Sequence, residues 1–169
     1  VQIVLAEKYQ LHPEFTSCPP PPPQSPPNFG GGKGGAEPQS VDADAVLLIG
    51  DAALKRLGST DYALDLGAEW DALTGLPFVY ACWVARGEVD LRNVPQTLQR
   101  AKELGITQIP EIARLEAPKL GFPEDFCRDY LTHHIFYDLG DSEIAGLMKF
   151  YELAVKYGLA EPGVSLRFV

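Results

Sequence analysis

The sequence predicts an α/β protein with a parallel or mixed sheet, and three observations indicate this class. Continuous apolar runs at 45–49 and 77–85 have the length and composition of buried strands. Other segments show the apolar spacing of helices. The strand-like runs come first and helical patterns dominate after residue 87, an order that favours strands joined by helical connections.

The remaining elements are expected from local patterns. Residues 1–9 have roughly helical apolar spacing and predict the end of an amphipathic helix that begins upstream. Further strands are expected at 11–17, 62–66 and 164–168. Further helices are expected at 52–57, 68–73, 93–104, 110–115, 123–131 and 142–157. Asp141 or Ser142 caps the last of these helices, and Glu143 adds an acidic residue to its first turn.

Residues 18–40 differ from the rest of the chain because they hold eight prolines and five glycines. Consecutive prolines favour polyproline II, and a glycine run has no preferred conformation. One interpretation is a proline-rich ligand for a partner module. The composition favours the other, a surface insertion without fixed structure.

The charge balance limits the classes of partner. The 169 residues include 14 Lys and Arg against 23 Asp and Glu, which gives a net charge of -9. This balance argues against a nucleic-acid surface and against an anionic membrane surface, since both need a basic face. An anionic small molecule remains compatible, because the local field of a pocket can oppose the net charge.

Cysteine usage and hydropathy point to a reduced, cytoplasmic protein. Cys18, Cys82 and Cys127 are too few and too widely spaced for a disulfide framework or a zinc pattern. Cys82 lies in the apolar run 77–85 and is expected to be buried. No apolar run approaches the ~18 residues of a membrane-spanning helix.

The most informative segment for function is 47–54, LLIGDAAL. A strand-like run meets a helix start at Gly50, and the free N–H groups of such a turn bind carboxylates well. Gly50, Asp51 and Ala52 are therefore candidate ligand-binding residues. The alternative is an ordinary strand-to-helix turn in which Asp51 is the N-cap.

Other polar residues give weaker signals, and none identifies a catalytic residue. Asp65 and Glu69 have the spacing of paired carboxylates, although solvated charges at a helix start explain them more simply. His133 and His134 are adjacent and would point roughly 100° apart on a helix, which disfavours a shared metal ion. His12 is isolated, and no metal or cofactor motif is present in the sequence.

The aromatic residues of 77–85 allow two interpretations. Phe78 and Tyr80 would share one face of the expected strand, and Trp83 would lie on the other. Such residues form a hydrophobic core more often than a platform for a ligand.

Three motifs together resemble the MqnA family, the chorismate dehydratases of the futalosine route to menaquinone. They are LLIGDAAL at 47–54, LDLGAEW at 64–70 and LTGLPFVYA at 73–81. The start and end of the chain fit as well, through LAEKY at 5–9, PEF at 13–15, YDLG at 137–140 and LRF at 166–168. The resemblance covers most of the chain outside 18–40.

The resemblance implies a two-lobed fold like that of type II periplasmic binding proteins, with the substrate between the lobes. It implies that chorismate loses water to give 3-[(1-carboxyvinyl)oxy]benzoate without a cofactor or a metal. The turn at Gly50, Asp51 and Ala52 carries over as the substrate contact, with Phe78 and Trp83 as weaker candidates.

The resemblance also implies that this chain corresponds to the downstream part of such an enzyme, so that the fold is incomplete. Residues 1–88 would form the second lobe with the insertion 18–40. Residues 89–169 would form a helical part that returns to the first lobe, and the isolated chain is expected to be inactive. The alternative function is a solute-binding protein of the same fold, which binds a small carboxylate without catalysis.

Overall fold

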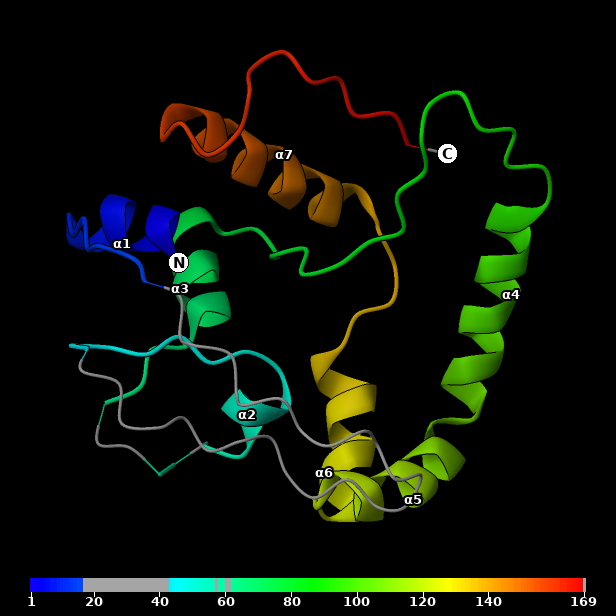
Figure 1. Cartoon of the computed structure of the whole chain (residues 1–169). Helices are drawn as coiled ribbons and strands as arrows, with labels where there is room; N and C mark the ends of the chain where they lie inside the picture. The colour runs from blue at the N-terminus through cyan, green and yellow to red at the C-terminus, as the bar shows by residue number, and fades with distance from the viewer. Residues whose placement is uncertain (17–42, 57, 60–61, 169) are drawn as a thin grey trace, which may run out of the picture. The chain divides into compact units, whose positions relative to one another are not determined.

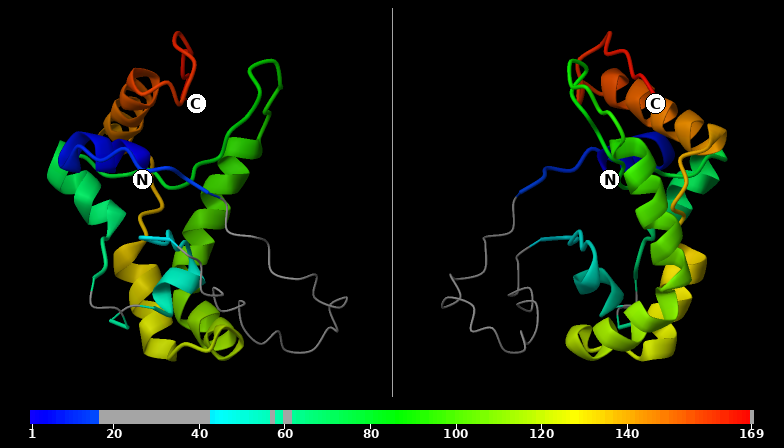
Figure 2. Two further views of the ribbon diagram at one scale, coloured as in Figure 1. Left: turned by 60° about the vertical axis from the view of Figure 1, so that its left-hand side comes forward. Right: turned by 90° about the vertical axis from the view of Figure 1, so that its right-hand side faces the viewer.

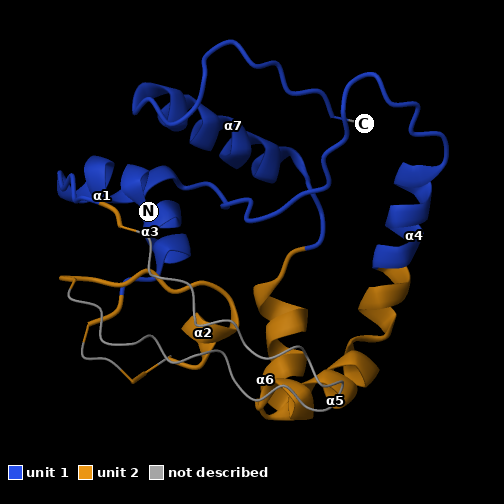
Figure 3. Cartoon of the chain, in the orientation of Figure 1, with its two compact units in different colours: residues 1–14, 64–102, 137–169 blue, residues 15–63, 103–136 orange. Residues whose placement is uncertain are grey.

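A computed structural model describes residues 1–16, 43–56, 58–59 and 62–168. The chain divides into two compact units, which are shown in different colours in Figure 3. Unit 1 comprises Val1–Glu14, Leu64–Lys102 and Tyr137–Val169. Unit 2 comprises Phe15–Ala63 and Glu103–Phe136.

The described residues form helices joined by irregular segments (Figure 1). In chain order these are α1 (Gln2–Tyr9), α2 (Asp51–Leu54), α3 (Leu66–Thr74), α4 (Val94–Thr107), α5 (Ile109–Leu120), α6 (Glu124–Asp129), the π-helix η1 (Tyr130–His134) and α7 (Asp141–Lys156).

The core of unit 1 lies among α1, α3 and α7, which come from distant parts of the sequence (Figures 1 and 2). Trp70 of α3 is its centre, with 1% of its surface exposed. The Trp70 ring meets the rings of Phe78 and Phe150 edge to face, at centroid distances of 5.5 and 6.0 Å. Four smaller buried residues complete the cluster, namely Ile3, Val4, Leu153 and Ala154.

The ends of α3 are fixed by its own sequence. The Asp65 carboxylate accepts hydrogen bonds from the backbone N–H groups of Gly67 and Ala68, at 2.8 and 3.0 Å, and so satisfies two donors of the first turn. Gly75 ends the helix at a φ of 65°, in the left-handed region that favours glycine.

A close approach also links α7 to the segment before Phe78. A Cβ atom placed on Gly146 would lie 2.0 Å from the carbonyl oxygen of Pro77, so only glycine allows this contact. The start of α7 is stabilised by Glu143, whose carboxylate accepts the N–H of Gly140 at 3.0 Å.

Unit 2 is built around the neighbouring helices α5 and α6. Its buried cluster is Ala113 and Ala117 of α5 with Cys127 of α6, and Phe122 and Phe126 pack against it. Small residues on α5 therefore let the two helices approach each other, and the two phenylalanines cover the contact.

The prediction of an α/β fold is wrong for the described residues, which contain no strand and hence no sheet. The expected strand at 45–49 is irregular and Ile49 is 78% exposed, where a buried strand was expected. The run 77–85 is irregular too, with Tyr80 and Trp83 exposed. The periplasmic-binding-protein-like fold implied by the resemblance is not supported either, because it needs a sheet.

The physical reason is that a strand depends on a neighbour. Apolar and β-branched side chains make a segment suitable for a sheet, but the ladder of hydrogen bonds to another strand creates the strand. The backbone of 81–85 makes none of the hydrogen bonds found among the described residues. The expected strands at 11–17, 62–66 and 164–168 are likewise absent where the structure describes them. Cys82, expected to be buried, is exposed.

The helical expectations fare better. The helix expected at 142–157 is α7, and those at 1–9 and 68–73 correspond to α1 and α3. The helix α4 continues two residues past Gly105, and α5 continues past Leu115 to Leu120 with Pro118 inside it. The expectations for 18–40 lie outside the described residues, and the lobes 1–88 and 89–169 stay a prediction.

Candidate functional site

The turn at Gly50 lies in unit 2, directly before the single helical turn α2. Gly50 is the N-cap, with φ 64° and ψ -141°, and its carbonyl oxygen accepts the N–H groups of Ala53 and Leu54 at 2.9 and 3.1 Å. An added Cβ atom would meet nothing within 4 Å. The positive φ, and not crowding, is therefore what favours glycine here.

Asp51 and Ala52 form the exposed first residues of α2. Asp51 is not the N-cap, since Gly50 holds that position. The side chain of Asp51 affects the buried thiol of Cys127, whose pKa is raised mainly by burial and further by the charge of Asp51. After α2, the Lys55 ammonium lies 5.7 Å from the centroid of the Phe122 ring, which ties this segment to the core of unit 2.

Phe78 and Trp83 lie in unit 1 and have different surroundings. The Phe78 ring packs edge to face against Tyr80 and Phe150, at centroid distances of 4.9 and 5.2 Å, in addition to Trp70. Phe78 is therefore a member of the aromatic core. Trp83 is 83% exposed and belongs to none of the ring contacts found among the described residues.

The five predicted site residues thus fall into two sets. Gly50, Asp51 and Ala52 lie together on one turn of unit 2, and Phe78 and Trp83 belong to unit 1. The first set lies at the exposed start of a single helical turn. The second offers an aromatic ring in a packed core and an exposed indole.

A polar cluster that sequence reasoning missed joins α1 to α3. The Glu69 carboxylate binds the Lys8 ammonium at 2.6 Å and accepts a hydrogen bond from the Tyr9 hydroxyl at 2.6 Å. The hydrogen bond from Lys8, followed by that from Tyr9, holds the pKa of Glu69 below its usual range. The side chain of Glu69 is 18% exposed, so it is a partnered carboxylate and not the solvated charge that the sequence favoured.

A second cluster of the same composition joins α1 to α7. The Glu7 carboxylate binds the Lys156 ammonium at 2.6 Å and accepts a hydrogen bond from the Tyr157 hydroxyl at 3.0 Å. The hydrogen bond from Lys156, followed by that from Tyr157, holds the pKa of Glu7 below its usual range. Burial and the bond to Glu7 raise the pKa of Tyr157. No spacing rule could have found either cluster, because the partners lie on separate helices.

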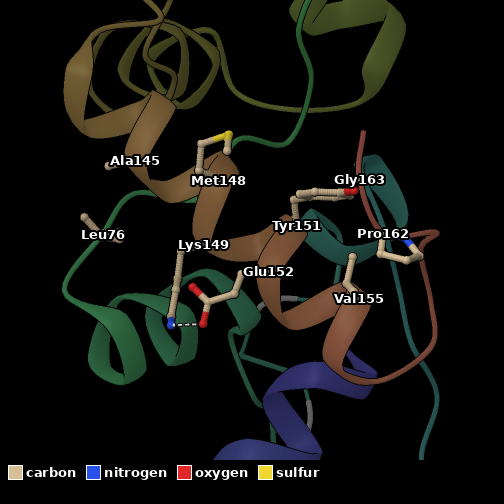
Figure 4. Close-up of a pocket in the computed structure, with 9 residues that line it drawn as sticks. All are labelled: Leu76, Ala145, Met148, Lys149, Tyr151, Glu152, Val155, Pro162 and Gly163. Carbon is tan, nitrogen blue, oxygen red and sulfur yellow. Dashed lines mark hydrogen bonds and ion pairs between the residues drawn. The ribbon is translucent and has the colours of Figure 1, made fainter. Parts of the chain in front are cut away.

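The outer side of α7 carries a groove of about 650 Å³ (Figure 4). It is lined by Leu76, Ala145, Met148, Lys149, Tyr151, Glu152, Val155, Pro162 and Gly163, all of unit 1. The Tyr151 hydroxyl donates to the carbonyl oxygen of Glu161 at 2.7 Å and accepts the N–H of Val164 at 2.9 Å. These two bonds hold the segment after α7 as one wall of the groove.

The two histidines of η1 share the carboxylate of Asp129. His133 Nδ1 lies 2.9 Å from one oxygen of Asp129, and His134 Nε2 lies 3.4 Å from the other. In the part of the chain that the structure describes, no group of three or more His, Cys, Asp or Glu side chains has the geometry of a metal site. None of the described helices is long and apolar enough to cross a membrane.

Comparison with known proteins gives the family. Residues 1–156 match a family model described as menaquinone biosynthesis. The chain is also similar to the chorismate dehydratase of Thermus thermophilus, with 33% identity over 128 residues. That similarity covers 64% of this chain and 46% of the relative, so the chain spans about half of the relative's length. No solved structure matches the chain. The chain therefore belongs to the menaquinone-biosynthesis family, and its resemblance to MqnA proteins is confirmed.

Proposed function

We propose that the chain forms part of a chorismate dehydratase, a carbon–oxygen lyase that converts chorismate into 3-[(1-carboxyvinyl)oxy]benzoate and water. The observation that carries the proposal is the match to the menaquinone-biosynthesis family together with the similarity to a chorismate dehydratase. The cytoplasm, where a biosynthetic enzyme meets its substrate, is the proposed location.

The proposed reaction needs no oxidant or reductant. A ring C–H bond of chorismate breaks, and its electron pair forms the new ring double bond as the C–O bond to the ring hydroxyl breaks. The proton and the hydroxyl group leave together as water, and the ring becomes aromatic. Because aromatisation drives the reaction, the protein chiefly has to hold the substrate and stabilise the charge that shifts in the ring.

We assign a carboxylate of the substrate to the turn at Gly50, Asp51 and Ala52. The support is the motif LLIGDAAL, which lies inside the region matched by the family model, and the positive φ that makes Gly50 the favoured residue. The N–H groups at the start of a helix attract anions, although α2 has only 4 residues and offers a small dipole. Phe78 and Trp83 remain weaker proposals for contact with the ring.

Calorimetric titration with chorismate tests this assignment. The chain is joined to the part of the Thermus thermophilus chorismate dehydratase that lies outside the matched region, which we call the complementing segment. Gly50→Ala strains the turn and should weaken chorismate binding at least tenfold.

The matched control is Gly58→Ala, because Gly58 also has a positive φ, of 72°, and also has nothing within 4 Å of an added Cβ. This control should change binding less than twofold. If Gly50→Ala and the unchanged protein bound chorismate with equal affinity, the turn would not be part of the substrate site. Binding without any turnover, in all proteins tested, would favour a solute-binding function over a lyase.

A further inference from the structure

The segment 81–85 of unit 1 has the chemistry of an open strand edge. Its backbone makes none of the hydrogen bonds found among the described residues, and no residue of 77–85 has a positive φ. Trp83 and Val84 are 83% and 86% exposed, and the neighbouring Tyr80 is 75% exposed. Apolar, strand-favouring side chains on a backbone whose N–H and C=O groups are accessible form a template on which another strand pairs.

The segment is anchored on both sides, so pairing requires little further ordering of its backbone. On one side, the Phe78 ring packs in the aromatic core against Trp70 and Phe150. On the other side, the Arg167 guanidinium donates to the carbonyl oxygen of Gly87 at 3.4 Å. The stretch between these anchors, which leads from α3 towards α4 in Figure 1, is exposed. A preorganised surface of this kind lowers the entropic cost of association.

The distribution of charge favours contact between two copies at this place. The chain has a net charge of -9, so copies repel each other over most of their surface. Residues 72–85, in contrast, carry no charged side chain. The uncharged stretch is therefore where two copies can approach with the least repulsion.

The sequence of the segment is complementary to itself when two copies run antiparallel about Cys82. In that register Tyr80 lies opposite Val84 of the second copy, and an aromatic residue opposite a β-branched one stabilises a sheet. Trp83 lies opposite Ala81 of the second copy, so a large side chain meets a small one. With Cys82 at a non-hydrogen-bonded position, Ala81 and Trp83 would exchange the hydrogen bonds of the ladder.

We propose that residues 80–84 form an interface at which two copies of this chain pair antiparallel about Cys82. A second copy is the partner because this register sets complementary side chains opposite each other and brings two exposed thiols together. The Cα atoms of a non-hydrogen-bonded pair lie ~4.5 Å apart, within the ~4.4–6.8 Å that a disulfide spans. The inference goes beyond the proposed function and does not depend on it.

Sedimentation velocity of the chain alone, without chorismate, tests the interface. The chain should form a dimer whose fraction rises with concentration. Ala81→Pro removes a ladder donor and Val84→Lys adds a charge to the edge, so each should weaken the dimer at least tenfold. The matched control is Val89→Lys, because Val89 is also exposed, at 54%, but lies outside the paired residues.

This control should change the dimer affinity less than twofold, and circular dichroism verifies that all variants keep their helices. A chain that stays monomeric at every concentration would overturn the proposal. Equal weakening of the dimer by Val84→Lys and Val89→Lys would overturn it as well.

Disulfide formation tests the register independently. In a Cys18→Ser chain, the oxidant diamide should take up the two thiol hydrogens and link two copies through Cys82, while the buried Cys127 stays reduced. In a chain that also carries Cys82→Ser, the Tyr80→Cys and Val84→Cys variants are prepared separately. Once mixed, they should link to each other at least tenfold faster than either links to itself. Equal rates for all pairings would indicate random collisions of exposed thiols and would overturn the register.

The complementing segment is the competing occupant of the same edge, and the tests distinguish the two. If the chain alone were monomeric, and only the complementing segment slowed alkylation of Cys82, the edge would not be a self-pairing interface. None of these measurements uses turnover of chorismate. The dimer and the enzyme can therefore fail separately.

Discussion

The two units are stabilised in different ways. The core of unit 1 joins helices from the start, middle and end of the chain around one large side chain, Trp70. The core of unit 2 joins the neighbouring helices α5 and α6 through small residues. Long-range contacts between large side chains concentrate stability in few positions, whereas local helix contacts spread it over many. Unit 1 should therefore be the more sensitive of the two to single substitutions.

The largest expected effect is at the centre of unit 1. Trp70→Ala removes a side chain that is 1% exposed and should lower the free energy of unfolding by about 3–5 kcal/mol, because it leaves a large cavity. Cys127→Ala in unit 2 deletes only a thiol and should cost about 1 kcal/mol. Urea unfolding followed by circular dichroism measures both. Equal losses of unfolding free energy for the two substitutions would contradict the expected difference in sensitivity between the units.

Gly146→Ala tests the close approach of α7 to Pro77. The new methyl group would lie 2.0 Å from the carbonyl oxygen of Pro77, so backbone atoms must move, and we expect a loss of about 1–3 kcal/mol. The control is Gly105→Ala in α4, where nothing lies within 4 Å of an added Cβ. This second substitution should stabilise the protein by about 0.5–1 kcal/mol, since alanine favours a helix interior. If both substitutions stabilised the protein, Gly146 of α7 would have to lie farther from Pro77 than the structure places it.

Acid should weaken unit 1 through Glu7 and Glu69. Both carboxyl groups have lowered pKa values in the folded chain, chiefly through hydrogen bonds from Lys156 and Lys8 respectively. Their stabilising effect is therefore fully present above the ordinary glutamate pKa. It is lost as the pH falls through the lowered values, because the unfolded chain then binds protons first.

Thermal melts between pH 6 and pH 3 measure this loss. Glu7→Gln and Glu69→Gln should each reduce the dependence of the melting temperature on pH. Glu88→Gln, a change at an exposed loop position, serves as the control and should leave it unaltered. An unchanged pH dependence in the first two variants would show that α1 is not held by these carboxylates.

The smallest expected effect comes from Trp70→Phe. The Trp70 Nε1–H group is buried and has no hydrogen-bond partner among the described residues, a condition that costs about 1–3 kcal/mol. Phenylalanine removes this donor but leaves a small void, and the two effects should cancel to within about 1 kcal/mol. A loss above ~2 kcal/mol in urea unfolding would mean that the indole N–H has an acceptor in solution.

Helices could be predicted from the sequence because their signals are local. The apolar spacing of α7 and its acidic first turn lie within a few residues of one another. Strands could not be predicted from the apolar runs 45–49 and 77–85, because a strand also requires a partner whose position no local pattern reveals. The same apolar composition that favours a sheet leaves Ile49, Tyr80 and Trp83 exposed when no strand lies alongside.

The turn at Gly50 was singled out through its motif, whereas the polar cluster around Glu69 in unit 1 was not predicted. Gly50 could be singled out because a glycine at a turn before a helix is a local pattern, and its positive φ agrees with that interpretation. Glu69 was assigned to solvent because its partners, Lys8 and Tyr9, lie about 60 residues away in the sequence. Contacts of that kind depend on the packing of α1 against α3, which only the fold reveals.

The most direct test of the proposed function is turnover of chorismate, followed by chromatography of the aromatic product. The substrate carries two carboxylates that must be held from several sides. A site that orients its substrate can lower the activation barrier by ~7–11 kcal/mol. The chain with the complementing segment should form 3-[(1-carboxyvinyl)oxy]benzoate, and the chain alone should form none above the uncatalysed background. A stable complex that produces no aromatic product would contradict the proposed enzyme, and turnover by the chain alone at the rate of the complex would contradict the expectation that the isolated chain is inactive.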